Sequence, residues 1–349
     1  MASATRDRNF MIAQLNRSYI AANPAKVWPR LLSYLFFEGR PATTKGRWFN
    51  PVTFRSLRSA AQCKPMPEAE SPIFITGTGR SGSTILGMVL SSHPDTGFLN
   101  EPKALWFLAN PKDDIIGSYS NGPANYIMNA GDATPEIAAS VKAMYSCYLK
   151  QSGTKRIIDK FPEMIFRIEY LNRIFSNPKY IFLHRNAKET IASTAIWSDS
   201  HRQPNHNEDW WGVGGRKWKL LAEQVVPNDD LLAPYVEIIS DFTSQHDRAA
   251  VEWIVTMNHG IKMCQAYPDK VMPLKYEDLA SNQETTLKKI CAFTGLSADQ
   301  KLIDFGVQTI KPSPNGYKIE IHPILLEPIA ILSEKLGYKT YSPSMSVTE

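Results

Sequence analysis

A glycine-rich turn between a predicted strand and a predicted helix is the part of the sequence best suited to bind an anion. Residues 73–76 (IFIT) are apolar and β-rich, residues 77–84 read GTGRSGST, and apolar residues follow at helical density. The first amides of a helix have no partner within it, and the helix dipole adds partial positive charge there. Such a junction can bind phosphate or sulfate. Arg80, Ser83 and Thr84 add a cation and two hydroxyls, which favours an anion site over a purely structural turn.

Three nucleotide-binding templates fit this turn. It contains the G-x-G-x-x-G of dinucleotide sites (Gly77, Gly79, Gly82), and Glu101 stands near the place where such a site has its acidic residue. It also nearly matches the triphosphate loop G-x-x-x-x-G-K-[ST], but Ser83 replaces the lysine that holds the β- and γ-phosphates. The third template is the loop that binds the 5′-phosphosulfate of 3′-phosphoadenosine 5′-phosphosulfate (PAPS). The glycine spacing alone does not choose among them.

A second strand-to-helix junction carries an arginine. Residues 179–183 (KYIFL) predict a buried strand, and His184 and Arg185 stand at its carboxyl end. Ser193 follows Arg185 by eight residues in a predicted helix over 187–196, so both can face the sheet edge where open α/β sheets bind ligands. Arg185 can hold a phosphate by a bidentate contact, whereas a triphosphate kinase would need an aspartate for magnesium. Two anion sites on neighbouring strands fit a nucleotide phosphorylated at both ends, as PAPS is.

Four segments, in order, resemble those of PAPS-dependent sulfotransferases. Residues 74–94 (FITGTGRSGSTILGMVLSSHP) resemble the family's 5′-phosphosulfate loop, and residues 180–193 (YIFLHRNAKETIAS) resemble its 3′-phosphate motif. Residues 157–175 (IIDKFPEMIFRIEYLNRIF) are similar to its Lys-x-Pro segment, and residues 274–296 (LKYEDLASNQETTLKKICAFTGL) to its Tyr-Glu-Asp-Leu segment. The resemblance covers about residues 71–337. Its motif style is closest to the bacterial, carbohydrate and tyrosylprotein branches.

This resemblance implies a three-layer, P-loop-like α/β fold and a division of the chain into two parts. We expect a central parallel sheet of about four or five strands flanked by helices, preceded by a helical extension. Residues 71–349 are predicted to form the PAPS-binding sulfotransferase domain. Residues 1–70 are predicted to be a basic, aromatic extension that ends in a linker at residues 63–72 (CKPMPEAESP).

The resemblance also assigns nucleotide-binding and catalytic roles. Arg80 and the first amides of the helix are expected to hold the phosphosulfate, and Arg185 and Ser193 the 3′-phosphate. Lys160, at the end of a predicted strand, is expected to neutralise the leaving bridging oxygen. The residues expected to hold the nucleotide are Gly79, Arg80, Ser81, Gly82, Ser83, Thr84, Arg185, Ser193 and, from a late basic loop, Lys318. Because a sulfuryl group carries less charge than a phosphoryl group, cations and amides can suffice, and no metal is expected.

A general base is needed to take the proton of an acceptor hydroxyl. Glu101 follows a short predicted strand over residues 97–99, so it too lies at a carboxyl end, and the carbohydrate and tyrosylprotein branches have a glutamate after the loop helix. The alternatives are that Glu101 caps the next helix or pairs with Arg80. His93 and His184 are rival bases, although helix capping and strand packing explain them equally well.

The acceptor region is predicted between the second junction and the following helix. This stretch contains His201, Trp210 and Trp211, and aromatic rings stack on sugars and cations. Two interpretations stay open: a lid over the acceptor, or tryptophans that fill the domain's own core. The acceptor is expected to be a hydroxyl, or else an amine, of a small metabolite, lipid or carbohydrate. The other function classes left open are an NAD(P)-binding oxidoreductase and a kinase-like P-loop enzyme.

Positive charge is concentrated in the N-terminal part. Residues 1–58 hold ten lysines and arginines against two acids, whereas the whole chain has a net charge of only +5. One interpretation is a peripheral contact with an anionic membrane, and nucleic acid is not expected as a partner. The alternative is a helical extension that packs its apolar side on the main domain and leaves its arginines in solvent.

Composition excludes several other classes. With 43% hydrophobic and 21% charged residues, the chain is neither mostly disordered nor a collagen or coiled-coil repeat. No apolar run approaches the length of a membrane span, and the N-terminus lacks the apolar core of a secretory signal. The four cysteines are far apart and match no metal or disulfide framework, so we expect reduced thiols and a cytoplasmic protein.

Overall fold

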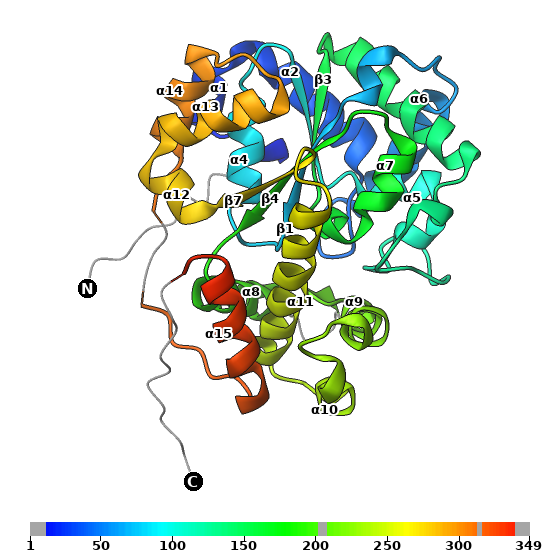
Figure 1. The fold of residues 1–349 in the computed structure, drawn as a ribbon. Coiled ribbons are helices and arrows are strands. Elements are labelled where there is room, and N and C mark those ends of the chain that lie inside the picture. Colours follow the sequence, from blue (N-terminus) through cyan, green and yellow to red (C-terminus); the bar gives the residue numbers. More distant parts are fainter. Residues whose placement is uncertain (1–11, 202–207, 313–315, 339–349) are drawn as a thin grey trace.

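A five-stranded parallel sheet forms the centre of the structure (Figure 1). The computed structural model describes residues 12–201, 208–312 and 316–338. The strand order is β2-β3-β1-β4-β7, and every neighbouring pair is parallel. The strands are β1 (Ile73–Gly77), β2 (Thr96–Asn100), β3 (Arg156–Lys160), β4 (Lys179–His184) and β7 (Val271–Lys275). The predicted α/β fold with four or five parallel strands is therefore confirmed.

Helices cover both faces of this sheet. The helices before β4 are α1 (Arg17–Ala22), α2 (Val27–Ser33), α3 (Asn50–Ala60), α4 (Ser83–Leu90), α5 (Lys103–Ala109), α6 (Pro135–Ser152) and α7 (Ile168–Ile174). Those after it are α8 (Ala187–His201), α9 (Arg216–Leu220), α10 (Val236–Ser240), α11 (Gln245–Ala266), α12 (Tyr276–Ser281), α13 (Gln283–Thr294), α14 (Gln300–Thr309) and α15 (Leu326–Lys335). The short strands β5 (Glu208–Asp209) and β6 (Gly212–Val213) form an antiparallel pair. Helices α8–α11 and α15 gather below the sheet in Figure 1.

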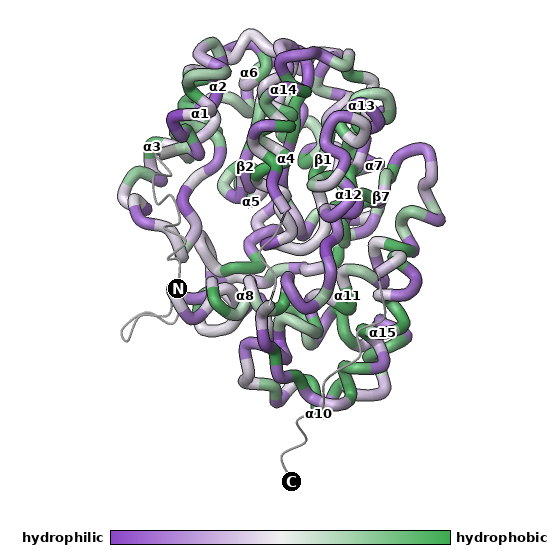
Figure 2. Tube along the Cα trace, turned by 90° about the vertical axis from the view of Figure 1, so that its left-hand side faces the viewer, coloured by the Kyte–Doolittle hydropathy of each residue, from purple (hydrophilic) through white to green (hydrophobic). Residues whose placement is uncertain are grey.

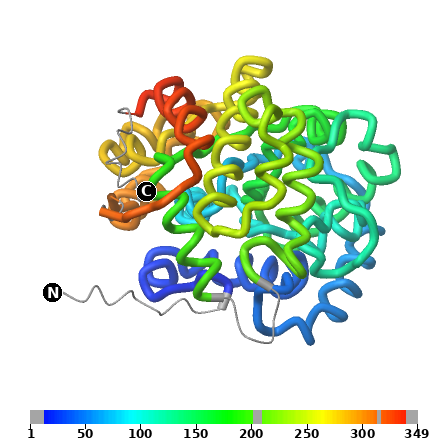
Figure 3. The backbone as a smooth tube through the Cα atoms, turned by 90° about the horizontal axis from the view of Figure 1, so that it is seen from below, coloured from blue at the N-terminus to red at the C-terminus, as the bar shows by residue number. Residues whose placement is uncertain are grey.

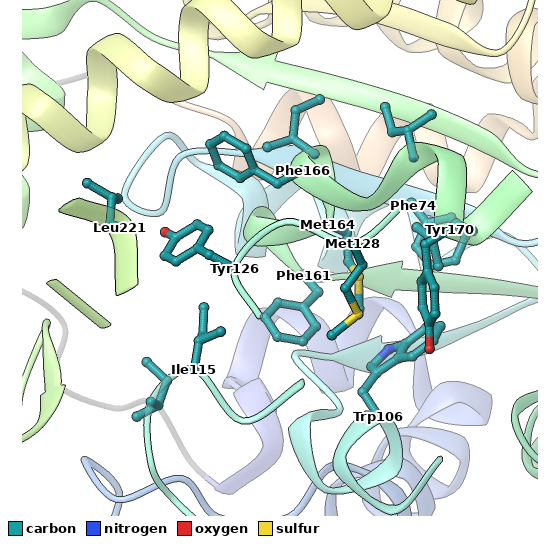
Figure 4. Close-up of a cluster of buried hydrophobic side chains, with 14 of the residues drawn as sticks. Phe74, Trp106, Ile115, Tyr126, Met128, Phe161, Met164, Phe166, Tyr170 and Leu221 are labelled. Carbon is teal, nitrogen blue, oxygen red and sulfur yellow. The ribbon is translucent and has the colours of Figure 1, made fainter. Parts of the chain in front are cut away.

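Two hydrophobic cores lie on the two faces because strand side chains alternate in direction. Phe74 of β1 belongs to the larger core, shown in Figure 4 with Trp106 and Tyr170. Its neighbours Ile73 and Ile75 belong to the second core. Because both faces are covered, β1 is buried along its whole length, which is why it reads as an unbroken apolar run. The outer helices α11 and α15 alternate between hydrophobic and hydrophilic segments in Figure 2.

The strand β7 lacked a clear sequence signal. It contains Pro273, which cannot donate a backbone hydrogen bond, so a central strand would not be expected there. The structure puts β7 at the edge of the sheet, next to β4 alone, where a proline is tolerated. The other strands lie where the sequence predicts them, within one or two residues at each end.

The N-terminal segment is helical, as expected, and lies on the side of the molecule opposite to α15 (Figure 3). The expectation that its arginines are solvated is wrong for two of them, because Arg30 and Arg40 are buried. Arg40 lies against the ring of Tyr34, 3.5 Å from its centroid, and donates to the Tyr34 carbonyl oxygen. The division of the chain at residue 70 stays a prediction.

Three further properties concern the described residues. All four cysteines are free thiols, as the sequence indicates. Among the described helices, none is both long enough and apolar enough to cross a membrane. Within the same ranges, no group of three or more His, Cys, Asp or Glu side chains is placed to hold a metal ion.

Candidate active site

The glycine turn joins the carboxyl end of β1 to the first residue of α4. Gly77 has a φ of 130°, and a Cβ there would lie 2.1 Å from the Leu183 carbonyl oxygen of the neighbouring strand. A Cβ at Gly79 would lie 2.2 Å from the ring of Trp210. Both positions therefore require glycine, one for the close strand approach and one because the indole covers the turn. Inside the turn, the hydroxyls of Thr78 and Ser81 are hydrogen-bonded at 2.5 Å, and Ser81 is buried.

The two predicted anion sites are in direct contact. Arg185, at the end of β4, donates from Nη1 to the carbonyl oxygen of Arg80 at 3.2 Å. Arg80 in turn donates from Nε to Ser193 Oγ of α8 at 3.3 Å. The side chain of Glu189 accepts from Arg185 at 2.8 and 3.0 Å and holds the guanidinium in place. Because β1 and β4 are neighbours in the sheet, the turn and Arg185 form one continuous surface.

Glu101 lies at the end of β2, between two lysines. Its carboxylate is ion-paired with Lys160 of β3 and, at 3.0 Å, with Lys103. Burial opposes ionisation of Glu101, but the two lysines outweigh it and hold the pKa of this carboxyl well below its ordinary value. The side chain of Lys160 is only 2% exposed, so this pair is shielded from water on the lysine's side. Pro102, and not Glu101, occupies the N-cap position of α5.

Backbone strain is concentrated at this site. Arg80 has a φ of 65° and Glu101 a φ of 51°, and they are two of four non-glycine residues with positive φ in the described part of the chain. Side chains rarely adopt this conformation, which costs free energy that the surrounding structure must offset. Such strain is typical of residues whose placement is functional.

A cavity of about 200 Å³ opens at the carboxyl ends of β1, β2 and β3. The sequence-predicted residues that line it are Gly79, Arg80, Ser83, Thr84, Glu101, Lys160 and Trp210. Ser193 and Arg185 border the same region through their contacts with Arg80. The structure thus brings the residues predicted from the glycine turn, from the ends of β2 and β3 and from the second junction together in one place, but not Lys318.

Comparison with known proteins identifies a family for one segment of the chain. Residues 72–226 match the sequence model of the Sulfotransferase family. This segment belongs to the sulfotransferase family. It contains the glycine turn, Glu101, Lys160, Arg185 and Ser193. The N-terminal segment and Lys318 lie outside it.

Two curated proteins are similar to this chain. The nodulation protein NoeE of Sinorhizobium fredii is 27% identical over 135 residues, which is 34% of this chain and 30% of NoeE. A Caenorhabditis briggsae protein named "Putative protein-tyrosine sulfotransferase" is 22% identical over 236 residues, 67% of this chain and 69% of that protein. The chain therefore spans less than a third of one relative and about two thirds of the other.

Solved structures of sulfotransferases are also similar. The sulfotransferase domain of the Synechococcus PCC 7002 olefin synthase has a TM-score of 0.47 and 18% identity, over 80% of this chain and 98% of that domain. STF9 of Mycobacterium avium has a TM-score of 0.46 and 12% identity, over 93% of each chain.

Sequence reasoning missed a buried group of charges on the far wall of the cavity. Lys217 forms ion pairs with Glu163 at 2.9 Å and Glu252 at 2.6 Å, and its Nζ lies 4.6 Å from the ring centroid of Trp210. Burial lowers the pKa of Lys217, but the two carboxylates outweigh this and raise it well above its ordinary value. Glu163 could have been found from its place three residues after Lys160. Lys217 and Glu252 had no local signal, because only the fold brings them to the site.

The predicted acceptor tryptophans have different roles. Trp210 lines the cavity and donates from its indole nitrogen to Glu252 at 2.7 Å. Trp211 is fully buried in the larger core and donates to Gln245 at 2.6 Å. Trp211 therefore fills the domain's own core, as one interpretation predicts, whereas a lid role for Trp210 stays a prediction. The backbone of His201 ends α8, but its side chain and residues 202–207 lie outside the described residues.

The remaining predicted residues lie away from the carboxylate–lysine pair. Lys318 is exposed on the late loop. His93 is hydrogen-bonded to Ser297 at 2.9 Å and accepts from the Asp95 amide. His184 is hydrogen-bonded to Tyr338 at 2.8 Å, and burial lowers its pKa to about 4. Both histidines thus have packing partners, which favours structural roles over the rival base role.

Proposed function

We propose that the chain is a PAPS-dependent sulfotransferase that moves a sulfuryl group to a hydroxyl of its acceptor and releases adenosine 3′,5′-bisphosphate. The observation that carries this proposal is the contact between Arg185 and the carbonyl oxygen of Arg80. Arg185, a cation suited to a second phosphate, lies against the glycine turn through this contact, and Gly79 and Arg80 of the turn line the cavity that contains Glu101 and Lys160. A nucleotide with phosphate groups at both ends matches this arrangement.

The residues present fit such a donor. The first amides of α4 and the hydroxyls of Ser83 and Thr84 suit the 5′-phosphosulfate, and Arg80 adds a cation. Arg185 and Ser193 suit the 3′-phosphate. The lysine with which a loop of this type usually binds a triphosphate is missing here, because Ser83 occupies its position. Lys318 as a further 3′-phosphate contact stays a prediction.

The reaction requires one bond to form and one to break. The acceptor oxygen bonds to sulfur, the bond from sulfur to the bridging oxygen of the donor breaks, and the acceptor proton passes to Glu101. Lys160 neutralises the negative charge that develops on the bridging oxygen, and the amides of the turn stabilise the equatorial oxygens. By analogy with phosphoryl transfer, positioning and electrostatic stabilisation supply most of the rate enhancement.

The ion pair of Glu101 and Lys160 links these two roles. In the structure, Lys160 keeps Glu101 ionised but makes it a weak base, because the pKa of the carboxyl is far below neutral. When Lys160 turns to the leaving oxygen, it no longer stabilises the carboxylate to the same extent. The pKa of Glu101 then rises, and the carboxylate becomes a stronger base in the complex that reacts.

The acceptor is proposed to be a hydroxyl of a small metabolite, lipid or carbohydrate, with Trp210 as a ring on which it stacks. Membrane contact through residues 1–58 stays a proposal, supported by the exposed rings of Trp28 and Trp48. A cytoplasmic location likewise stays a prediction.

A thermal-shift comparison tests the choice of donor. Adenosine 3′,5′-bisphosphate should raise the unfolding midpoint, whereas ATP with magnesium and NADP should raise it little, since a ligand stabilises only in proportion to its affinity for the folded state. The matched assay measures transfer of labelled sulfate from PAPS to a panel of hydroxyl compounds. A larger shift with NADP would favour an oxidoreductase, and a larger shift with ATP and magnesium would favour a kinase.

A further inference from the structure

The outer side of β2 is covered by side chains of the N-terminal segment. In the described sheet β2 is an edge strand, paired with β3 on one side only. Successive residues of a strand point their backbone groups to alternate sides, so Thr96, Phe98 and Asn100 direct theirs away from β3. A buried edge of this kind must find other hydrogen-bond partners.

Three charged side chains supply those partners along the edge. Lys26 donates to the carbonyl oxygen of Thr96 at 2.8 Å, and Arg30 donates to that of Phe98 at 3.4 Å. Glu38 accepts from the backbone amide of Asn100 at 2.8 Å. All three side chains are buried. Much of the buried charge of this segment is thus used within the fold to complete the edge of the sheet.

The last of these contacts adjoins Glu101. Asn100 is fixed by Glu38 on the outer side, and the amide of Glu101 donates to the carbonyl oxygen of Lys160 at 2.7 Å on the inner side. Glu101 has the strained φ of 51° between these two anchors. Glu38 is held in turn by Arg30, which contacts both of its carboxylate oxygens, one of them at 3.0 Å.

The same segment also reaches the cavity. Pro41, Thr43 and Thr44 line it, and the amide of Ala42 between them donates to Ser118 Oγ at 3.0 Å. The family match begins only at residue 72, so none of these positions is covered by it.

We infer that Glu38 is a positioning residue for Glu101: by accepting the Asn100 amide, it holds the strained end of β2 so that the carboxylate meets Lys160 in the cavity. This inference rests on the proposed role of Glu101 as the base. It assigns a function to the N-terminal segment that needs neither a membrane nor a nucleic acid.

Two double variants distinguish the loss of the hydrogen-bond acceptor for the Asn100 amide from the loss of the buried charge of Glu38. Replacing Arg30 by Met together with Glu38→Gln keeps an oxygen for the Asn100 amide, and Arg30→Met with Glu38→Leu removes it, while neither leaves an unpaired buried charge. The glutamine variant should keep kcat within about threefold of wild type. The leucine variant should lose about 10- to 100-fold in kcat, as expected for a displaced catalytic group, with an unchanged KM for PAPS.

Lys26→Met is the matched control, because it removes a contact from the same edge at the end remote from Glu101. It should lower the unfolding midpoint while leaving kcat unchanged. Equal kcat values for the two double variants would overturn the inference, as would a crystal structure of the leucine variant in which Glu101 keeps its φ and its pair with Lys160. Full turnover in Glu101→Gln would instead refute the proposed base, and the crystal structure would still decide the positioning claim.

Discussion

Arg185 and Arg80 meet through a hydrogen bond of 3.2 Å from the guanidinium of one to the backbone oxygen of the other. Two sequence motifs 105 residues apart are thereby joined into one surface at neighbouring strand ends. A purely structural arginine would need only this contact and that to Glu189. Through the carbonyl oxygen of Arg80, the same contact holds Arg185 against the glycine turn that leads into α4.

Replacing Arg185 by Ala should remove recognition of the 3′-phosphate. We expect the affinity for adenosine 3′,5′-bisphosphate to fall about 10- to 100-fold, the usual effect of losing hydrogen bonds to a charged group. The affinity for adenosine 5′-phosphate, which lacks that group, should barely change. Calorimetric titration of both ligands measures the difference, with exposed Arg173→Ala as the control. An equal loss for both ligands would show that Arg185 acts only through the fold.

Replacing Glu101 by Gln should abolish turnover without abolishing nucleotide binding. The amide cannot accept the acceptor's proton, so kcat should fall about 10²- to 10⁴-fold, the range of general-base contributions. The Kd for adenosine 3′,5′-bisphosphate should stay within a few-fold of wild type. Steady-state sulfate transfer and calorimetry check the two halves. A variant with near-normal kcat would remove Glu101 from the base role.

Trp210 and Trp211 are adjacent in sequence but should respond differently to substitution by Phe. Trp210→Phe should raise the KM for the acceptor because the ring lines the cavity, and although it loses the bond to Glu252 it should cost less stability than Trp211→Phe because Trp210 is only partly buried. Trp211→Phe should destabilise the fold by about 2 kcal/mol, since it shortens a fully buried ring and removes a bond to Gln245. Urea unfolding and acceptor kinetics on both variants make the comparison. Reversed effects would contradict the assignment.

Asp159 should make stability depend on pH. It is fully buried next to Lys160 in β3, and burial raises its pKa to about 7 although Tyr145 and Trp106 donate to it. The folded state thus keeps a proton that the unfolded chain has lost, so stability falls as pH rises from about 4 to about 7, by about 1.4 kcal/mol per pH unit at most. Above pH 7 the loss is constant.

Asp159→Asn should remove this dependence. The amide carries no charge and can still accept from Tyr145 and Trp106, so the variant should match wild type near pH 4 and exceed it in stability at pH 8. Chemical unfolding at several pH values, with the exposed Asp241→Asn as the control, measures the gap. A gap that does not widen with pH would contradict the raised pKa.

The sheet and the donor side of the site were predictable because their signals are local. The run 73–76 and the run 179–183 are apolar on both faces of the sheet, and the glycine turn needs small residues at fixed spacing. The sequence predicts Glu101 and Lys160 at the carboxyl ends of parallel strands, which meet at one edge of a sheet, but it does not predict their ion pair, because the partner it suggests for Glu101 is Arg80. Each of these inferences required only the residues of one segment and a general rule of α/β folds.

The rest depended on contacts between distant segments. Lys217 and Glu252 belong to separate helices, and no spacing in the sequence relates them to Glu163. The basic N-terminal segment suggested solvated or surface-binding charge, because the sequence does not show that Lys26 and Arg30 find backbone partners on β2. A sequence shows the sign of a residue's charge, but it does not show whether the fold buries that residue.

A crystal structure with adenosine 3′,5′-bisphosphate tests the central claim most directly. The account predicts one nucleotide, with its 5′-phosphate on the amides between Ser81 and Thr84 and its 3′-phosphate on Arg185 and Ser193. A nucleotide that leaves Arg185 unoccupied, or phosphates bound in two unconnected places, would contradict it.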